Sequence, residues 1–540
     1  MAVPQQQFQQ PIGQLLIAKG VISEDQLRIA TQEQSKSPQP LGRLLVRLGF
    51  LSEATIRDVL SENLGQETVD LATVIVDSAA VTLIPKEVAR RYQLVPISVD
   101  TGSKNLTLAI ADPDNIIALD QVRALLKDEY RLITLLASES DILRAIDQYY
   151  GFELSIDGIL HEIEPGEMEH QGLQQGVNEF SQPVVRLIDA LLTEAVQQNA
   201  SDIHFEPENS FLRIRYRVDG VLRQVRSLHK SFWPAMVVRL KVMSGMNIAE
   251  TRAPQDGRIS LRLSGRPIDF RVASHPTSYG ENLVLRILDR QKGLVPINQL
   301  GLDESALTLL LSIIAKPEGI VLVTGPTGSG KTTTLYAAIS EINDGASKII
   351  TIEDPVEYQV PGVLQIPVNE RKGLTFALGL RSILRHDPDK IMVGEIRDPE
   401  TAQIAVQAAL TGHLVFSTVH ANNVFDVLGR FEHMAVDPYT FVSALNGIVA
   451  QRLVRVFCTH CHGKGCTECR GTGFKGRRAI GECLLLDDEL RELIATRAPV
   501  RVIKEAARAR GTRLLRESAQ DMVRLGLTSQ AEIDRITFAG

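Results

Sequence analysis

The chain has few cysteines, no excess of basic residues and no long apolar run. Only five of its 540 residues are cysteine, and four of them lie within the twelve residues 458–469. Because this is not the pattern of a small disulfide-held secreted domain, a reducing compartment is expected. No apolar run reaches the roughly 18 residues of a membrane span, and the first ten residues lack the basic and apolar regions of a signal peptide. These absences predict a cytoplasmic protein that touches membrane only through partners.

The charge balance is mildly acidic, with 58 basic and 65 acidic residues and a net charge of −7. Nothing in this balance favours a surface for binding polyanions, so direct nucleic-acid binding is not expected. The hydrophobic content of 44% is ordinary for a globular protein. A chain of this length is too long for one core and predicts three or four domains.

An internal repeat occupies the first part of the chain. Residues 11–34 and 40–63 align with nine identities across a five-residue spacer. Each copy predicts a helix, a glycine that ends it, which is Gly20 or Gly49, and a second helix capped by serine. One interpretation is a duplicated helical hairpin that packs on itself or docks on a partner.

Further regions follow the repeat. Short strands and helices continue to about residue 150, and the acidic, Gln- and Gly-rich stretch 153–180 is interpreted as a linker. The next region alternates apolar and polar residues with period two, which predicts a half-exposed antiparallel sheet.

A glycine-rich loop carries the strongest chemical signal. The stretch "EGIVLVTGPTGSGKTTTLYAAI" places an apolar strand, the loop and a helical pattern in the order that a phosphate-binding loop requires. Glycines let backbone N–H groups turn toward phosphate oxygens, and the helix N-terminus adds its positive dipole end. Lys331 would reach the β and γ phosphates, and Thr332 would hold Mg²⁺. The predicted nucleotide-binding residues are Gly325, Pro326, Thr327, Gly328, Ser329, Gly330, Lys331, Thr332 and Thr333.

Acidic residues near two apolar strands are candidates for the rest of this site. The strand in "DKIMVGEIRD" has Gly394 where such folds normally place an Asp for Mg²⁺, followed by Glu395. A carboxylate for Mg²⁺ must then come from elsewhere, and "IITIEDPVEY" offers Glu353, Asp354 and Glu357. We predict that Glu395 polarises the attacking water and that Glu357 helps to hold Mg²⁺.

Two histidines flank another apolar strand in "TGHLVFSTVHANN". His420 comes just after the strand, where a side chain that senses the γ-phosphate would lie, whereas His413 comes before it. A lone histidine is more often structural, and it is the neighbouring acidic motifs that favour a role for His420.

Two Cys-x-x-Cys pairs, separated by four residues, predict a tetrahedral Zn²⁺ site. The four sulfurs belong to Cys458, Cys461, Cys466 and Cys469. Four thiolates close the coordination shell, which indicates a structural rather than a catalytic metal. The alternatives are four free thiols and a site in which His460 or His462 replaces one sulfur.

The motifs at 325–332, 350–358, 389–398 and 411–420 resemble the signature boxes of secretion-superfamily ATPases. The resemblance is closest to the motors of type II secretion and type IV pilus assembly and covers residues 11–540. It implies an α/β multidomain fold, with a RecA-like P-loop ATPase core preceded by a small α+β, PAS-like domain and an N-terminal helical and α+β region. The implied parts are the N-terminal region 1–152, the linker 153–180, the second N-terminal domain 181–300, the ATPase core 301–456, a zinc-binding insert 457–484 and a C-terminal helical region 485–540.

The resemblance also implies a mechanism and partners. Motors of this family are cytoplasmic homohexamers at the inner membrane that use ATP to add pilin or pseudopilin subunits through a platform protein. Their second N-terminal domain contributes arginines to the nucleotide phosphates, and the matching positions here are Arg217, Arg271 and Arg286. A solvated strand face is the other interpretation, because Arg213, Arg215 and Arg217 alternate along one strand. The tetracysteine site is typical of assembly motors rather than retraction motors.

The repeat at 11–63 resembles the tandem motif of an N-terminal cyclic di-GMP-binding domain in some of these ATPases. That motif usually begins Arg-Leu-Gly, whereas this chain has Pro11-Ile12-Gly13 and Pro40-Leu41-Gly42. Cyclic di-GMP is therefore a hypothesis beside ATP, Mg²⁺ and Zn²⁺. The alternatives for the whole chain are a cyclic di-GMP-responsive regulatory or scaffold protein, and a retraction or DNA-translocating motor.

Overall fold

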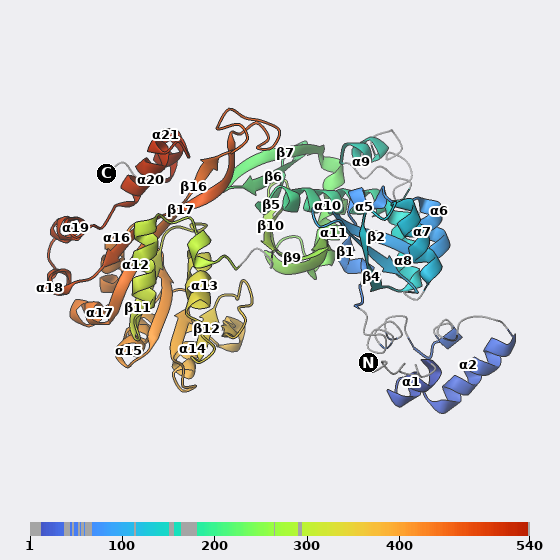
Figure 1. Ribbon diagram of the computed structural model, residues 1–540, viewed down its shortest axis with the longest axis horizontal. Helices are drawn as coiled ribbons and strands as arrows, with labels where there is room; N and C mark the ends of the chain where they lie inside the picture. The colour runs from blue at the N-terminus through green and yellow to red at the C-terminus, as the bar shows by residue number, and fades with distance from the viewer. Residues whose placement is uncertain are drawn as a thin grey trace, which may run out of the picture. The chain divides into compact units, whose positions relative to one another are not determined.

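The chain divides into two compact units (Figure 1). The computed structural model describes residues 12–36, scattered positions between 41 and 59, and 67–537 apart from 113–114, 151–155, 164–180, 264 and 290–293. Unit 1 ends at Leu288, and unit 2 comprises 289–540 together with the short segment 219–221. Among the described residues, no helix combines the length and the apolar character of a membrane span.

The first repeat copy folds as two short helices, α1 (Ile12–Ala18) and α2 (Glu24–Lys36). Gly20 follows α1 with φ of +69°, a left-handed conformation that glycine adopts without strain. Ser23 and Gln26 exchange hydrogen bonds of 2.8 and 3.2 Å at the start of α2, which is a capping box. The predicted helix, glycine stop and capped helix are thus confirmed for this copy. Gly49 has the same conformation, but most of the second copy lies outside the described residues.

A three-stranded sheet in the order β2-β3-β4 follows, with β2 and β3 antiparallel and β3 and β4 parallel. Its buried aliphatic side chains pack against the surrounding helices in one core. The short strand β1 pairs instead with β8 of the next sheet. The elements are β1 (Val74–Ile75), α5 (Ser78–Val81), α6 (Lys86–Tyr92), β2 (Leu94–Asp100), β3 (Asn105–Ile110), α7 (Ile116–Leu125), β4 (Arg131–Leu136) and α8 (Glu139–Tyr149).

The second sheet of unit 1 has the strand order β1-β8-β9-β10-β5-β6-β7. Its pairs β5 with β6, β8 with β9 and β10 with β5 are antiparallel, and buried residues alternate with more exposed ones along β6. The predicted half-exposed antiparallel sheet is therefore confirmed. The elements are α9 (Ile156–Ile163), α10 (Ser181–Gln197), β5 (Ala200–Pro207), β6 (Phe211–Val218), β7 (Val221–His229), α11 (Trp233–Ser244), β8 (Gln255–Leu263), β9 (Arg266–Thr277) and β10 (Gly280–Asp289).

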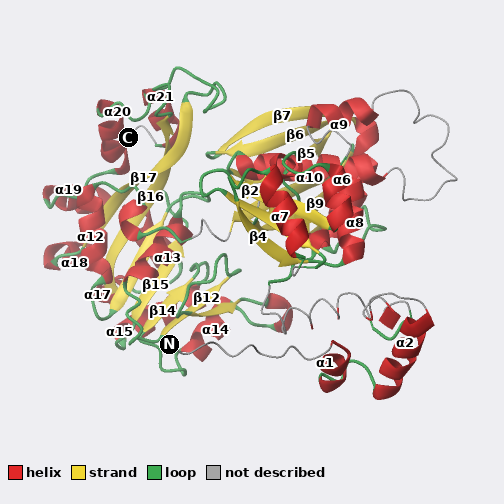
Figure 2. Ribbon diagram, turned by 45° about the vertical axis from the view of Figure 1, so that its right-hand side comes forward, coloured by secondary structure: helices red, strands yellow, loops and turns green. Residues whose placement is uncertain are grey.

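Unit 2 is built on a seven-stranded sheet in the order β13-β12-β14-β15-β11-β16-β17, with helices on its faces (Figure 2). The strand pairings are parallel except that of β16 with β17. The strands are β11 (Gly319–Thr324), β12 (Ile349–Glu353), β13 (Leu364–Pro367), β14 (Lys390–Val393), β15 (Leu414–Val419), β16 (Leu445–Phe457) and β17 (Phe474–Leu485). The helices are α12 (Glu304–Ile314), α13 (Lys331–Glu341), α14 (Phe376–Ile383), α15 (Pro399–Leu410), α16 (Val424–His433), α17 (Pro438–Ala444), α18 (Asp488–Ala495), α19 (Val500–Ala509), α20 (Leu515–Arg524) and α21 (Gln530–Ile536).

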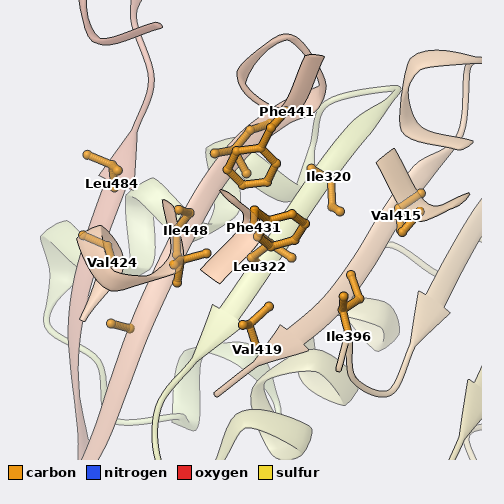
Figure 3. Packing of buried hydrophobic residues seen from close by; sticks show 14 of the residues in the cluster. Ile320, Leu322, Ile396, Val415, Val419, Val424, Phe431, Phe441, Ile448 and Leu484 are labelled. Carbon is orange, nitrogen blue, oxygen red and sulfur yellow. The ribbon is translucent and has the colours of Figure 1, made fainter. Parts of the chain in front are cut away.

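The interior strand β11 is buried on both faces, as strands of parallel sheets commonly are. Ile320 and Leu322 point into one core, where the rings of Phe431 and Phe441 stack with centroids 4.2 Å apart (Figure 3). Val321 and Val323 point into a second core formed with α12 and α13. This double burial fixes the strand from which the phosphate-binding loop leaves the sheet.

Parallel pairing brings the candidate motifs to one edge of this sheet. The ends of β11 and β15 are in register at Thr324 and Val419, and Val393 of β14 pairs with Ser417 of β15. The chain segments that follow these three strands therefore emerge side by side. In open α/β sheets, ligands bind outside the carboxyl ends of the strands.

Candidate functional site

The loop between β11 and α13 has the backbone of a phosphate-binding loop. Gly325, Gly328 and Gly330 have φ of +145°, +78° and +90°, values that side chains rarely tolerate. A Cβ atom on Gly325 would lie 2.5 Å from the carbonyl oxygen of Gln451. Glycine is therefore required here by both conformation and space.

Gln451 holds this loop from the neighbouring strand β16. Its Nε2 donates to the carbonyl oxygen of Ser329 at 2.9 Å, and its Oε1 accepts a hydrogen bond of 2.7 Å from the Thr334 hydroxyl. The side chain is fully buried, so the amide has no competition from water. Gln451 was not predicted from the sequence, although an amide in the middle of the apolar pattern "GIVAQRLV" was a usable signal.

Lys331 begins α13 and is buried at the centre of the site. Its Nζ donates to the carbonyl oxygens of Gly325 at 2.9 Å and Pro326 at 3.1 Å. Burial lowers the pKa of Lys331, Arg452 lowers it further, and the negative charge of Glu395 acts in the opposite direction. Thr332, the predicted Mg²⁺ ligand, lies in the first turn of α13 with its side chain exposed.

Glu395 and His420 meet where β14 and β15 end. His420 Nε2 lies 3.3 Å from Glu395 Oε2, and Arg397 contacts the other carboxylate oxygen. Desolvation and the charge of Lys331 lower the pKa of His420 below its ordinary 6.5 and favour the neutral ring, although the charge of Glu395 acts in the opposite direction. His413 lies at the opposite end of β15, with Nδ1 2.9 Å from the carbonyl oxygen of Ala408. The structure therefore brings His420 into the site and leaves His413 outside it.

Gly394, which stands where an Asp was expected, lies close to the neighbouring strand β12. A Cβ atom at this position would lie 3.3 Å from the carbonyl oxygen of Ile352 and 3.4 Å from the Cα atom of Glu353. The first contact is tighter than most Cβ contacts, and the second is an ordinary van der Waals contact. A side chain here would therefore require a small shift of β12.

The acidic segment after β12 is the remaining source of carboxylates at this edge. Glu353 is buried and accepts hydrogen bonds from Thr351 Oγ1 at 2.6 Å and Gln365 Nε2 at 3.0 Å. The Glu357 N–H donates to the Tyr336 hydroxyl at 3.3 Å, whereas the side chain of Asp354 is exposed. Glu353 thus takes part in structural hydrogen bonds, and Asp354 and Glu357 are the other carboxylates of this segment.

The predicted arginines lie on three strands of the seven-stranded sheet of unit 1. Arg217 of β6 and Arg286 of β10 both contact Asp202 of β5, at 3.2 and 3.3 Å. Arg271 lies on β9, opposite Arg258 of β8. The sheet therefore gathers Arg217 and Arg286 at one acidic side chain. Two other arginines of β6 form separate ion pairs, Arg213 with Glu208 and Arg215 with Glu206.

The four clustered cysteines form a compact sulfur site in the loop 458–473, beyond the ends of β16 and β17 (Figure 1). Their Sγ atoms all lie within 4.8 Å of one another, and the closest pairs are 3.7 to 3.9 Å apart. Four sulfurs at about 2.3 Å from a tetrahedral zinc ion would be about 3.8 Å apart. The residues present therefore fit Zn²⁺. Neither His460 nor His462 belongs to this group, so four sulfurs suffice.

Backbone donors support thiolates in this site. The N–H groups of Cys466 and Gly473 both point at Cys469 Sγ, at 3.2 Å, and the Gly465 N–H lies 3.3 Å from Cys461 Sγ. Desolvation raises the pKa of Cys469, but these N–H groups and neighbouring thiols outweigh it and lower the pKa to about 6. Hydrogen bonds to metal-bound sulfur are a common feature of the second shell of metal sites.

Comparison with known proteins gives matches over nearly the whole chain. A family model described as type II/IV secretion system protein matches residues 178–535, and one described as MshEN domain matches residues 64–156. The chain is 38% identical over 557 aligned positions to the type IV pilus assembly ATPase PilB of Myxococcus xanthus, covering 97% of this chain and 98% of that protein. It is 50% identical over 363 residues to the type II secretion system protein HxcR of Pseudomonas aeruginosa, covering 66% of this chain and 77% of that protein.

A solved structure supports the same relationship. The ATPase DotB of Legionella pneumophila superposes with a TM-score of 0.51 at 25% identity, covering 65% of this chain and 94% of that one. The predicted α/β fold with a P-loop ATPase core is thereby confirmed. These two relatives carry the names of an ATPase and a secretion protein, as the four sequence boxes predicted.

Proposed function

The chain belongs to the type II/IV secretion system protein family, and from this premise we propose that it is a motor ATPase for assembly of an extracellular fibre. Its hydrolysis of ATP drives addition of pilin or pseudopilin subunits to a type IV pilus or a type II secretion pseudopilus. The chain works as a cytoplasmic homohexamer at the inner membrane and acts through a platform protein.

The observation that carries this proposal is the meeting of three motifs at one sheet edge. Lys331 lies in the loop after β11, Glu395 follows β14, and His420 follows β15 within 3.3 Å of Glu395. In the proposed mechanism, Lys331 binds the β and γ phosphates, and Glu395 orients the attacking water and accepts its proton. His420 reports the presence of the γ-phosphate when the single N–H of its neutral ring changes its partner from Glu395 to a phosphate oxygen.

Thr332 and Glu357 are the proposed holders of Mg²⁺, because Gly394 leaves no carboxylate at the usual position. When bound, Mg²⁺ neutralises charge on the phosphates. Arg217 and Arg271 are proposed to act on the same phosphates when subunits close within a ring, where a positioned cation stabilises developing negative charge. Asp202 holds the guanidinium of Arg217 until then.

Zn²⁺ bound by Cys458, Cys461, Cys466 and Cys469 is proposed to shape the loop 458–473 as a rigid projection. The loop contains no residue of the phosphate site, so a docking role toward the platform protein suits it better than a role in hydrolysis. The N-terminal region, which includes the matched segment 64–156, is proposed to bind cyclic di-GMP and to bias the motor.

An experiment in the source bacterium separates assembly from the other motor functions. Deleting the gene should abolish surface fibres or pseudopilus-dependent secretion, and the wild-type gene should restore them. Lys331→Ala should fail to restore them, whereas Lys372→Ala, an exposed lysine outside the site, should succeed. An increase in surface fibres on deletion would identify a retraction motor instead, and normal fibres with Lys331→Ala would indicate a scaffold.

A further inference from the structure

Tyr336 lies on the helix that starts at Lys331, and its hydroxyl reaches the acidic segment after β12. The side chain is completely buried. The hydroxyl donates its proton to the Glu353 carboxylate and accepts the Glu357 N–H at 3.3 Å. One hydroxyl thus joins two points of the acidic segment to the helix of the phosphate-binding loop.

The direction of these hydrogen bonds is fixed by the surroundings. Glu353 already accepts from Thr351 and Gln365, and as a carboxylate it can only accept. Burial, together with the Glu353 charge, raises the pKa of Tyr336 well above its ordinary value, so the hydroxyl keeps its proton. The oxygen lone pairs of Tyr336 therefore remain available for the Glu357 N–H.

Glu357 lies in a segment without strand or helix, and this hydrogen bond is one of the contacts that hold it. Residues 354–360 have no regular secondary structure, and Gln365 instead anchors the carbonyl oxygen of Tyr358 at 3.0 Å. The ring of Tyr358 packs edge-on against that of Tyr336, with centroids 6.3 Å apart. The helix that carries Lys331 is thus also a support for the turn that carries Glu357.

We propose that Tyr336 is a positioning residue that fixes Glu357 relative to the phosphate-binding helix and so sets how tightly the site holds Mg²⁺. This inference rests on the proposed function, in which Glu357 helps to hold the cation. Tyr336 itself touches neither cation nor nucleotide in this account. Its removal should therefore change the Mg²⁺ requirement of hydrolysis and leave metal-free nucleotide binding unchanged.

The test uses the full chain with Tyr336→Phe. ATP hydrolysis is measured against free Mg²⁺ at saturating ATP, and binding of a fluorescent ATP analogue is measured in EDTA. The free Mg²⁺ needed for half-maximal hydrolysis should rise by about 5-fold, which corresponds to about 1 kcal/mol and is the size of one lost hydrogen bond. Analogue affinity in EDTA should match the wild type.

Thr351→Val is the matched control, because it removes a different hydroxyl from the same Glu353 carboxylate. It should keep the wild-type Mg²⁺ requirement. An equal rise in both variants would overturn the proposal, because the effect would then come from Glu353 alone. If Tyr336→Phe unfolds, the double variant Tyr336→Phe with Glu353→Gln is used instead. It also removes the buried Glu353 charge, which has lost a hydrogen bond in the single variant. The same rise in the free Mg²⁺ needed for half-maximal hydrolysis is expected from it.

A separate arm with Glu357→Gln distinguishes failure of this inference from failure of the proposed function. If Glu357→Gln leaves the Mg²⁺ requirement unchanged, the proposed role of Glu357 is wrong. If Glu357→Gln raises the requirement and Tyr336→Phe does not, Glu357 holds Mg²⁺ without help from Tyr336, and the positioning role is refuted.

Discussion

Glu395 is the residue on which the proposed chemistry depends most. It follows β14, its carboxylate contacts both His420 and Arg397, and its charge acts on Lys331. A carboxylate in this position can orient water and accept its proton. Arg397 and His420 hold the carboxylate from two sides and so limit its rotamers.

Replacing Glu395 with Gln should keep ATP binding but lower the turnover number by about 10²-fold, the scale of a lost general base. Gln preserves shape and hydrogen bonding but cannot accept the proton. Steady-state hydrolysis and nucleotide binding should be measured on the same preparations. Glu400→Gln, an exposed change at the start of α15, is the control and should behave as the wild type. Near-normal turnover in Glu395→Gln would refute the role.

The residues that could be predicted from sequence are those whose motif is local. The glycines of the loop, Lys331 and His420 were found from spacing relative to strands, because each strand end is itself visible as an apolar run. Gln451 and Tyr336 were not found. Gln451 is separated from Thr334 by 117 residues, and Tyr336 from Glu357 by 21. Such contacts depend on strand order, which no local pattern encodes.

At the scale of elements, the β16–β17 hairpin links the ATPase sheet to the cysteine loop. The rings of Phe457 and Phe474 stack at the base of the loop, with centroids 5.2 Å apart, and Arg455 lies over Phe474 at 4.4 Å. The region predicted as an insert, 457–484, thus contains the loop 458–473 and all of β17 except its last residue, Leu485. This division could not be predicted, because the alternation of apolar and polar residues in a two-stranded ribbon resembles that of a small separate domain.

Changing Cys458 and Cys461 to Ser should release zinc and disorder the loop locally. Sixteen glycine-rich residues cannot bury enough apolar surface to offset the entropy of ordering them without a metal. Zinc should be counted by elemental analysis, with about one ion expected per wild-type chain. Cys483→Ala, which changes a buried cysteine outside the cluster, should keep the ion.

The same double variant should bind ATP normally, because no phosphate-site residue lies in the loop. Fibre assembly should be impaired more than hydrolysis. Much less than one zinc ion per wild-type chain would refute the metal site. Normal fibre assembly by a zinc-free variant would refute the docking role and leave zinc with only a local role in stabilising the loop.

For the whole molecule, the proposed ring predicts that hydrolysis depends on assembly. Activity per subunit should rise with protein concentration as rings form, monitored by sedimentation on the same samples. Arg217→Ala should lower the turnover number of assembled rings by about 10-fold or more, the scale of a lost cationic contact with developing charge. Arg213→Ala, on the same strand but paired with Glu208, is the matched control. Full activity from strictly monomeric protein would contradict the ring requirement.

Binding of cyclic di-GMP by the N-terminal region is the other proposed property of the whole chain that needs a direct test. Isothermal titration of the full chain with cyclic di-GMP should give saturable heat if the region binds the dinucleotide, since micromolar affinity corresponds to about −8 kcal/mol. The first copy of the repeat has the predicted helices, but Pro11 and Pro40 stand where an arginine would pair with guanine or phosphate. If about 100 μM cyclic di-GMP gives no heat, the region does not bind the dinucleotide, and the interpretation as a module that docks on a partner is favoured.

The most direct test of the account is steady-state ATP hydrolysis by the purified full chain, with and without Mg²⁺, compared with Lys331→Ala. Lys331 is buried in the loop after β11, and its ammonium group is the cation proposed to bind the transferred phosphate. The account predicts Mg²⁺-dependent turnover in the wild type and a loss of about 10²-fold or more in the variant. Turnover in Lys331→Ala equal to that of the wild type would contradict it.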